Sequence, residues 1–137
     1  MERQIPVPLL PPWLRWLGVI AVAAVIFYTS VIVVPPEMPK PEFAPLDKWL
    51  HFLAYAGLGW SLAYATVGES DRRPLHKALL VFSVVFGYGL GIEVIQSFLP
   101  YRYFGFGDLV ANGIGAALGL TWIGLEKRMK FVRAGLG

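Results

Sequence analysis

The chain has 137 residues, of which 56% are hydrophobic and 15% are charged, and its mean hydropathy is +0.58. Soluble domains carry roughly 25% charged residues, so a water-soluble fold of this size would have too little polar surface to cover itself. The sequence contains no cysteine, which excludes disulfides and cysteine-ligated metal centres. The length suits one domain, and the composition predicts a small integral membrane protein.

Four apolar stretches are long enough to cross a bilayer as helices, which takes about 17–25 residues each. They cover residues 16–34, 49–67, 78–99 and 109–125, and prolines or a short polar segment separate them. The first stretch exceeds a signal-peptide core and no small-residue cleavage site follows it, so we expect it to remain as a helix. Because nothing alternates with the period of a membrane barrel, the expected fold is an all-α membrane protein with four transmembrane helices. Residues 1–137 then form a single membrane domain.

The basic residues set the expected orientation in the membrane. Of the 12 Lys and Arg, nine lie at the helix ends next to the two termini and the connection 68–77, and three lie at the opposite ends. Short segments rich in Lys and Arg stay in the cytoplasm. Both termini are therefore expected in the cytoplasm, in a multi-pass protein of the cell membrane. No nucleic-acid partner is expected, because no basic stripe with stacking aromatics is present.

The polar residues of the stretches gather at one depth, the predicted outer-leaflet end. Eight polar residues lie in the second, third and fourth stretches or in the residues that border their outer ends: Asp47, Lys48, His51, Glu93, Gln96, Arg102, Asp108 and Asn112. An ionisable residue inside a membrane costs a few kcal/mol, so it indicates a functional site by default. Glu93 is the strongest case, and its alternative interpretation is a pair with Lys48 or Arg102 that only holds helices together.

Small residues at helical spacing predict close packing beneath this cluster. The patterns are Gly87-x-x-x-Gly91 in the third stretch, Gly115-x-x-x-Gly119 in the fourth, and Ala54, Gly57 and Ser61 in the second. Their expected effect is to bring the second, third and fourth helices close enough for the polar groups to meet.

In their order along the chain, these residues resemble the VanZ-like family. The resemblance rests on Asp47-Lys48-x-x-His51-Phe52-x-x-Tyr55-x-x-Leu58, Glu93-x-x-Gln96-x-Phe98-x-Pro100-x-Arg102 and Asp108-x-x-x-Asn112-x-x-Gly115-x-x-x-Gly119. It covers roughly residues 15–125. It implies a small multi-helix membrane protein of a family named for a teicoplanin-resistance determinant, and it adds Tyr55 to the site residues.

The chemistry of the cluster favours an anionic partner. Arg102, Lys48 and His51 offer cationic or donor groups that suit a phosphate or carboxylate. The first hypothesis is therefore a protein that binds the headgroup of an anionic membrane lipid or a lipid-linked cell-envelope precursor. Its binding residues are Asp47, Lys48, Tyr55, Gln96, Arg102 and Asn112. The link to glycopeptide (teicoplanin) resistance is what the resemblance to the VanZ-like family implies.

The alternative is a membrane-embedded enzyme that hydrolyses or transfers a lipid-linked phosphate or headgroup. Its candidate catalytic residues are His51 as nucleophile or acid–base, with Glu93 or Asp108 orienting it. Asp47, Glu93 and Asp108 are also possible oxygen ligands for Mg²⁺. A transporter is the third hypothesis, and it would need an oligomer, because a cluster at one end supplies no polar path across the membrane.

Overall fold

The computed structural model describes residues 4–33, 45–68, 73–101 and 106–135. For residues 45–48 it describes the helical backbone only. The side chains of Asp47 and Lys48, and the whole of Arg102, therefore lie outside the described part of the chain.

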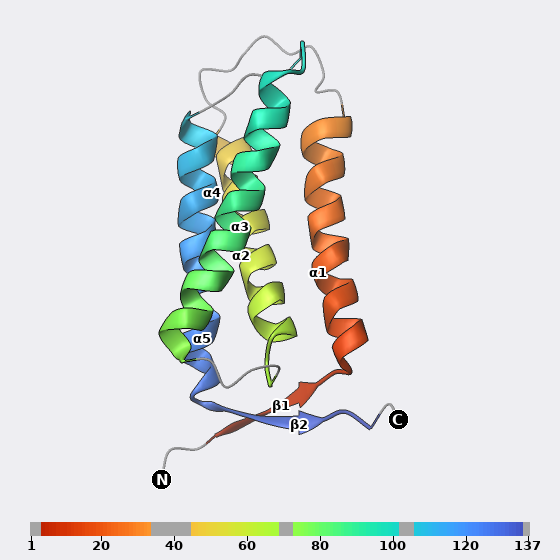
Figure 1. Ribbon diagram of the computed structural model, residues 1–137, viewed down its shortest axis with the longest axis vertical. Coiled ribbons are helices and arrows are strands. Elements are labelled where there is room, and N and C mark those ends of the chain that lie inside the picture. Colours follow the sequence, from red (N-terminus) through yellow and green to blue (C-terminus); the bar gives the residue numbers. More distant parts are fainter. Residues whose placement is uncertain (1–3, 34–44, 69–72, 102–105, 136–137) are drawn as a thin grey trace.

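The chain folds into an up-and-down helical bundle (Figure 1). Helix α1 (Pro12–Phe27) continues into a π-helical turn η1 (Tyr28–Ile32), and α2 (Pro45–Ala65) and α3 (Pro74–Ser97) follow. Helix α4 (Phe106–Gly119) is followed by the short α5 (Thr121–Glu126). We call the end where α2 and α4 begin and η1 and α3 end the loop end, and the opposite end, which holds both termini, the strand end.

Three helical segments are long and apolar enough to cross a membrane, namely Pro12–Ile32, Pro74–Ser97 and Phe106–Glu126. Many large apolar side chains, among them those of Ile20 and Val84, point outward from the bundle and are exposed. An apolar exterior of this kind is expected for helices that face lipid. Three of the four predicted spans are thus matched, while the span over α2 remains a prediction.

Three helices begin earlier than predicted because each has a proline as its first residue. The structure starts α1, α2 and α3 at Pro12, Pro45 and Pro74, where the sequence analysis placed the starts at residues 16, 49 and 78. Proline lacks the N–H that the first helical turn leaves unbonded, and its φ suits a helix. Prolines that separate the apolar stretches are therefore also the first residues of the helices. The fourth predicted helix is interrupted near Leu120, whose N–H bonds Ala117 O at 3.1 Å.

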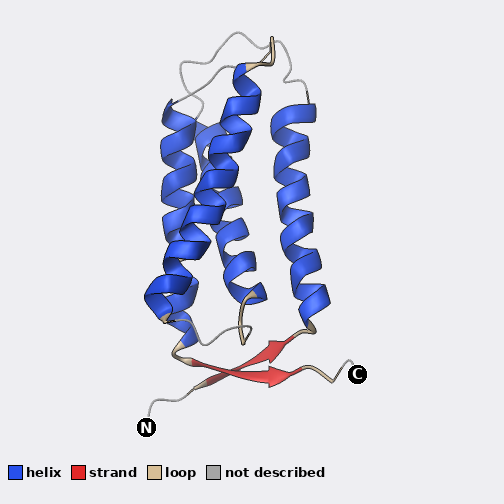
Figure 2. Cartoon of the chain, viewed as in Figure 1, coloured by secondary structure: helices blue, strands red, loops and turns tan. Residues whose placement is uncertain are grey.

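The prediction of an all-α fold was wrong in one respect, because the strand end carries a two-stranded parallel ladder (Figure 2). Strand β1 (Ile5–Leu9) pairs with β2 (Met129–Arg133), with Ile5 opposite Met129 and Leu9 opposite Arg133. Pro6 and Pro8 alternate with the residues that bond to β2, so their missing N–H groups fall on the other edge of β1. The ladder joins the two ends of the chain, and two five-residue segments carry too little periodicity to reveal it.

The closest contact in the bundle is between α2 and α4, and glycines make it possible. A Cβ placed on Gly119 would lie 2.8 Å from Gly59 Cα, and one on Gly115 would lie 2.5 Å from Phe52 O. The Gly115-x-x-x-Gly119 prediction is confirmed. On α2 the contact uses Gly59 rather than Gly57, around which space is open.

Buried polar side chains hold α1 to the rest of the bundle at both ends. At the strand end Arg15 Nη1 donates to the carbonyl oxygens of Tyr64, Ala65 and Val67 at 3.2, 3.0 and 2.8 Å. These carbonyls belong to the last turn of α2 and the turn that follows it, where helical N–H donors run out, although Tyr64 O also accepts from Val67 N–H at 3.2 Å. Arg15 is only 6% exposed, so the residue that the sequence analysis counted as a marker of orientation is also a cap for α2.

Substituting Gly115 by Ala is expected to lower the free energy of unfolding by about 1–3 kcal/mol, because backbone atoms of α2 would have to move. Gly57→Ala on the facing helix adds the same methyl group to open space and is the matched control. The unfolding midpoint in a mild detergent measures both. Equal midpoints for the two variants would contradict the close α2–α4 contact.

Candidate functional site

Three helices bring polar side chains together in the half of the bundle nearest the loop end. Tyr55 comes from α2, Glu93 from α3 and Asn112 from α4, and these side chains are 1%, 0% and 0% exposed. Glu93 lies close enough to Tyr55 for the two groups to interact electrostatically. We call Tyr55, Glu93 and Asn112 the buried polar cluster. The structure therefore joins three of the residues that the sequence analysis selected.

Gly89 makes room for this cluster. A Cβ on Gly89 would lie 2.9 Å from Tyr55 Cε1 and 3.1 Å from Asn112 Nδ2. The tyrosine ring and the asparagine amide thus rest directly on the backbone of α3, one turn before Glu93. The predicted contact glycines of this helix, Gly87 and Gly91, instead face open space, so that part of the packing prediction was wrong.

The cluster holds hydrogen-bonding groups that the described protein does not satisfy. Tyr55 Oη and both side-chain amide atoms of Asn112, Nδ2 and Oδ1, are buried and have no hydrogen-bond partner within the described residues. A buried polar group left unbonded costs about 1–3 kcal/mol. Native proteins keep few such groups, and each one calls for an explanation such as a bound water, an ion or a ligand. The cluster therefore has unused capacity to bind polar atoms.

Two predicted site residues lie nearer the loop end than the cluster. His51 is one helical turn before Tyr55, half-buried, with its ring stacked on that of Tyr55 at 6.5 Å between centroids and 4° between planes. Asp108 is half-buried in the first turn of α4, one turn before Asn112. These groups form a second, more accessible layer above the buried cluster.

Gln96 has a structural role that the sequence analysis did not anticipate. Its Nε2 donates to Ser30 O at 2.8 Å, and the hydroxyl of Tyr101 donates to Val31 O at 2.9 Å. Both acceptors lie in the last turn of η1, where helix carbonyls have no partner of their own. Gln96 thus helps to close the C-terminal end of η1 against α3, and its contact with a ligand stays a prediction.

The remaining predicted site residues lie outside the described part of the chain. They are the side chains of Asp47 and Lys48, and Arg102. Among the described side chains, no three His, Asp or Glu residues come together as a metal site would require. The Mg²⁺ hypothesis includes Asp47 and therefore stays a prediction.

Sequence reasoning missed Gly89 and Ser30, although one signal for Gly89 was present. Gly89, Glu93 and Gln96 follow the i, i+4, i+7 spacing of one helical face, and all three are buried. A glycine on the face that carries the polar residues is the one expected at the contact. Ser30 contributes its backbone carbonyl, which no side-chain pattern reveals.

The fold and its buried polar cluster define a small helical membrane protein. The chain matches the model of the VanZ/LLP1 family over residues 9–125, and it belongs to that family. It is also 39% identical over 85 residues to an uncharacterized protein of Schizosaccharomyces pombe. That alignment covers 62% of this chain and 49% of the yeast protein, so the matched part spans about half the length of this relative. No solved structure matches the chain.

A pair of tyrosine variants tests whether the Tyr55 hydroxyl is unsatisfied in the ligand-free protein. Tyr55→Phe is expected to raise the free energy of unfolding by up to about 1 kcal/mol, because it removes a buried group that has no partner. Tyr64→Phe is the control, since the Tyr64 hydroxyl accepts from Leu10 N–H at 3.0 Å and donates to Pro8 O at 2.8 Å.

Loss of those two bonds should lower the stability by about 0.5–1.5 kcal/mol. The measurement is detergent unfolding after lipid has been removed. A Tyr55→Phe variant destabilised as much as Tyr64→Phe would show that the Tyr55 hydroxyl already has a partner.

Proposed function

We propose that the loop end of this protein binds the headgroup of an anionic membrane lipid or a lipid-linked cell-envelope precursor. The observation that carries the proposal is the set of buried, unsatisfied atoms, Tyr55 Oη with Asn112 Nδ2 and Oδ1, beside the fully buried Glu93. A headgroup that enters between α2, α3 and α4 would supply the missing partners. The hydrogen bonds of the headgroup would offset the free-energy cost of burying the unsatisfied groups of Tyr55 and Asn112.

The chemistry of the site assigns different parts of the headgroup to two groups of residues. A phosphate would be repelled by Glu93, so we assign the buried cluster to hydroxyl or amino groups of the headgroup. We assign the phosphate to Lys48, in the first turn of α2, and to Arg102, which lies between α3 and α4 in the sequence. A lysine supplies a point charge and an arginine a bidentate pair of donors. His51, stacked on Tyr55, lies on the route from the loop end to the cluster.

The proposal includes the orientation of the protein in the cell membrane. We place α2 as the fourth span and both termini in the cytoplasm, so that the loop end faces the outer leaflet. Most of the Lys and Arg residues then lie on the cytoplasmic side. In this proposal, the link to glycopeptide resistance is the binding of an envelope precursor at the outer leaflet.

A second candidate function is hydrolysis or transfer of the bound headgroup. The stacking of His51 on Tyr55 favours it, because the histidine ring is held beside the buried cluster and one helical turn nearer the loop end, the end to which we assign the headgroup phosphate. A histidine imidazole can act as nucleophile or as general acid–base. Product release from lipid-linked phosphates by the wild-type protein, lost in His51→Ala while headgroup binding is kept, would favour this candidate over binding alone.

A reporter fused to the C-terminus tests the orientation. We expect a cytoplasmic reporter to be active and an exported one to be inactive, because both termini follow the basic side of the helices. A reporter fused within residues 35–44 should give the opposite result. An external C-terminus would invert the membrane depth of the site and contradict the proposal.

Native mass spectrometry of the purified protein tests the binding itself. Wild type is expected to retain an anionic lipid at the loop end, and Asn112→Leu should retain one lipid fewer than wild type, because the amide is replaced by an apolar side chain of similar size. Tyr64→Phe alters a tyrosine of the strand end and should retain the lipid. Equal retention by all three proteins, or no retained lipid in wild type, would overturn the proposed function.

A further inference from the structure

A second candidate site lies at the strand end, away from the buried polar cluster. A cavity of about 660 Å³ is enclosed by the end of β1, the start of α1, the turn after α2 and the residues that follow β2. Its walls are mostly apolar, and two of the lining residues, Arg15 and Arg133, are cationic. No acidic residue lines it in the part of the chain that the structure describes. Its size falls within the range of about 300–1,000 Å³ typical of small-molecule sites.

The guanidinium of Arg15 is fixed in place and only partly used. Its Nη1 makes all three of the hydrogen bonds to the end of α2. Arg15 is only 6% exposed, and its Nε is buried and has no hydrogen-bond partner in the described part of the chain. Its Nη2 makes no hydrogen bond within the described residues and is not one of the atoms that the protein encloses. The guanidinium thus keeps donors for an acceptor that the described protein does not provide.

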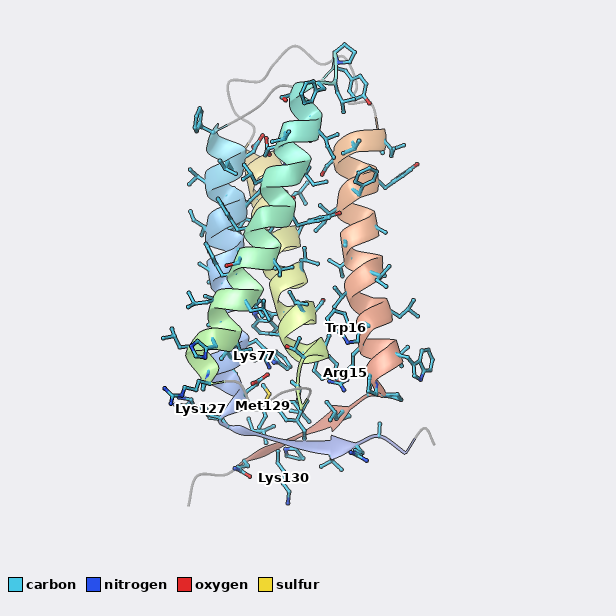
Figure 3. The ribbon with its side chains drawn as sticks, viewed as in Figure 1. Arg15, Trp16, Lys77, Lys127, Met129 and Lys130 are labelled. Carbon is cyan, nitrogen blue, oxygen red and sulfur yellow. The ribbon has the colours of Figure 1, made fainter. Side chains whose placement is uncertain are left out.

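The surroundings of Arg15 favour an anion as that acceptor. Pro11, the N-cap of α1, and Pro12, its first residue, line the cavity, so the positive end of the helix dipole of α1 lies there. Arg133, the last residue of β2, pairs in register with Leu9 and adds a second guanidinium at the wall. Figure 3 shows Arg15 at the base of α1, beside the end of α2 and above the strands.

The other cations that the structure describes at the strand end do not line this cavity. Lys77 is bound to Glu126 at 2.5 Å, and Lys127 and Lys130 are exposed and do not line it. The two arginines are therefore distinct from the general basic character of this end. Arginine forks also match the geometry of phosphate oxygens better than lysine does.

We propose that this cavity binds a phosphate group through Arg15 and Arg133. The phosphate can belong to an anionic phospholipid headgroup or to a soluble phosphate compound, since both present the same oxygens to the two guanidinium groups. The site is independent of the loop-end function, because it shares no residue with the buried polar cluster and opens at the other end of the bundle.

The test compares inorganic phosphate with lipid bilayers as the source of the anion. Wild-type protein in a neutral detergent is titrated with inorganic phosphate, against chloride at equal ionic strength, and its unfolding temperature is followed. The same protein is then reconstituted into nanodiscs of phosphatidylglycerol or of phosphatidylcholine. Saturable protection by phosphate indicates a soluble ligand, whereas protection only in phosphatidylglycerol discs indicates a lipid headgroup.

Arg133→Gln should weaken the protective interaction about tenfold, because it removes one of the two guanidinium groups. Lys130→Gln, on the same strand but outside the cavity, is the matched control and should bind as wild type does. Gly135→Phe is a second variant that leaves both arginines intact. A side chain there starts in open space and would fill the cavity, so protection should be lost.

Three results would overturn the proposal. They are the absence of protection from both sources, equal weakening by Arg133→Gln and Lys130→Gln, and full protection in Gly135→Phe. The second would show that the anion responds only to the overall basic charge of this end. None of these results bears on the lipid retained through Asn112, so the two sites are tested separately.

Discussion

The close approach of α2 to α4 is the constraint on which the candidate site depends. Gly115 and Gly119 let the two backbones come nearer than a side chain at either position would allow, and Gly89 lets the side chains of Tyr55 and Asn112 rest on the backbone of α3. Tyr55 lies between these glycines, since a Cβ on Gly115 would be 3.0 Å from Tyr55 Cβ and one on Gly89 would be 2.9 Å from its ring. The tyrosine is therefore held between two helices, and its hydroxyl is buried as a result of that packing.

Hydrogen bonding separates the structural polar residues from the candidate functional ones. In a membrane every backbone group needs a partner from within the protein. Arg15, Tyr88, Gln96 and Tyr101 meet that need by donating to backbone carbonyls of another element, with Tyr88 Oη bonded to Ala23 O at 2.6 Å. Tyr55 and Asn112 are more deeply buried than these residues, yet they satisfy no backbone group within the described chain. That difference supports the proposal that a ligand binds at Tyr55 and Asn112.

The sequence predicted the helical membrane class, the packing motif of α4 and three members of the buried polar cluster. Apolar length and helical spacing are local properties that can be recognised within about twenty residues, and they indicated the helices, Glu93 and Asn112. Tyr55 was added only by the resemblance to the VanZ-like family. The helix starts were predicted several residues too late, because a proline can either interrupt a helix or be its first residue. The β1–β2 ladder and the capping of α2 by Arg15 were missed for another reason. Both features join residues that are far apart in the chain. A local sequence pattern does not predict to which distant carbonyl oxygen an arginine will donate a hydrogen bond.

The choice between Gly89 and its neighbours shows the same limit within one helix. Gly87, Gly89 and Gly91 are close in sequence, and only the arrangement of the neighbouring helices decides which of them is at a contact. The polar residues of α3 identify that face, because Gly89 lies on the side that carries Glu93. The polar residues and the contact glycine of α3 thus lie on the same helix face. The positions of the polar residues therefore indicate Gly89 rather than Gly87 or Gly91.

The central claim is that a headgroup supplies the partners that Tyr55 and Asn112 lack. The most direct test is the stability of wild type and Asn112→Leu, each measured in lipid-free detergent and again in bilayers of the native anionic lipid. The account predicts a reversal. The variant should be the more stable protein without lipid, because it buries no unsatisfied amide, and wild type should be the more stable with lipid. The same order of stability in both conditions would contradict a headgroup site at the loop end.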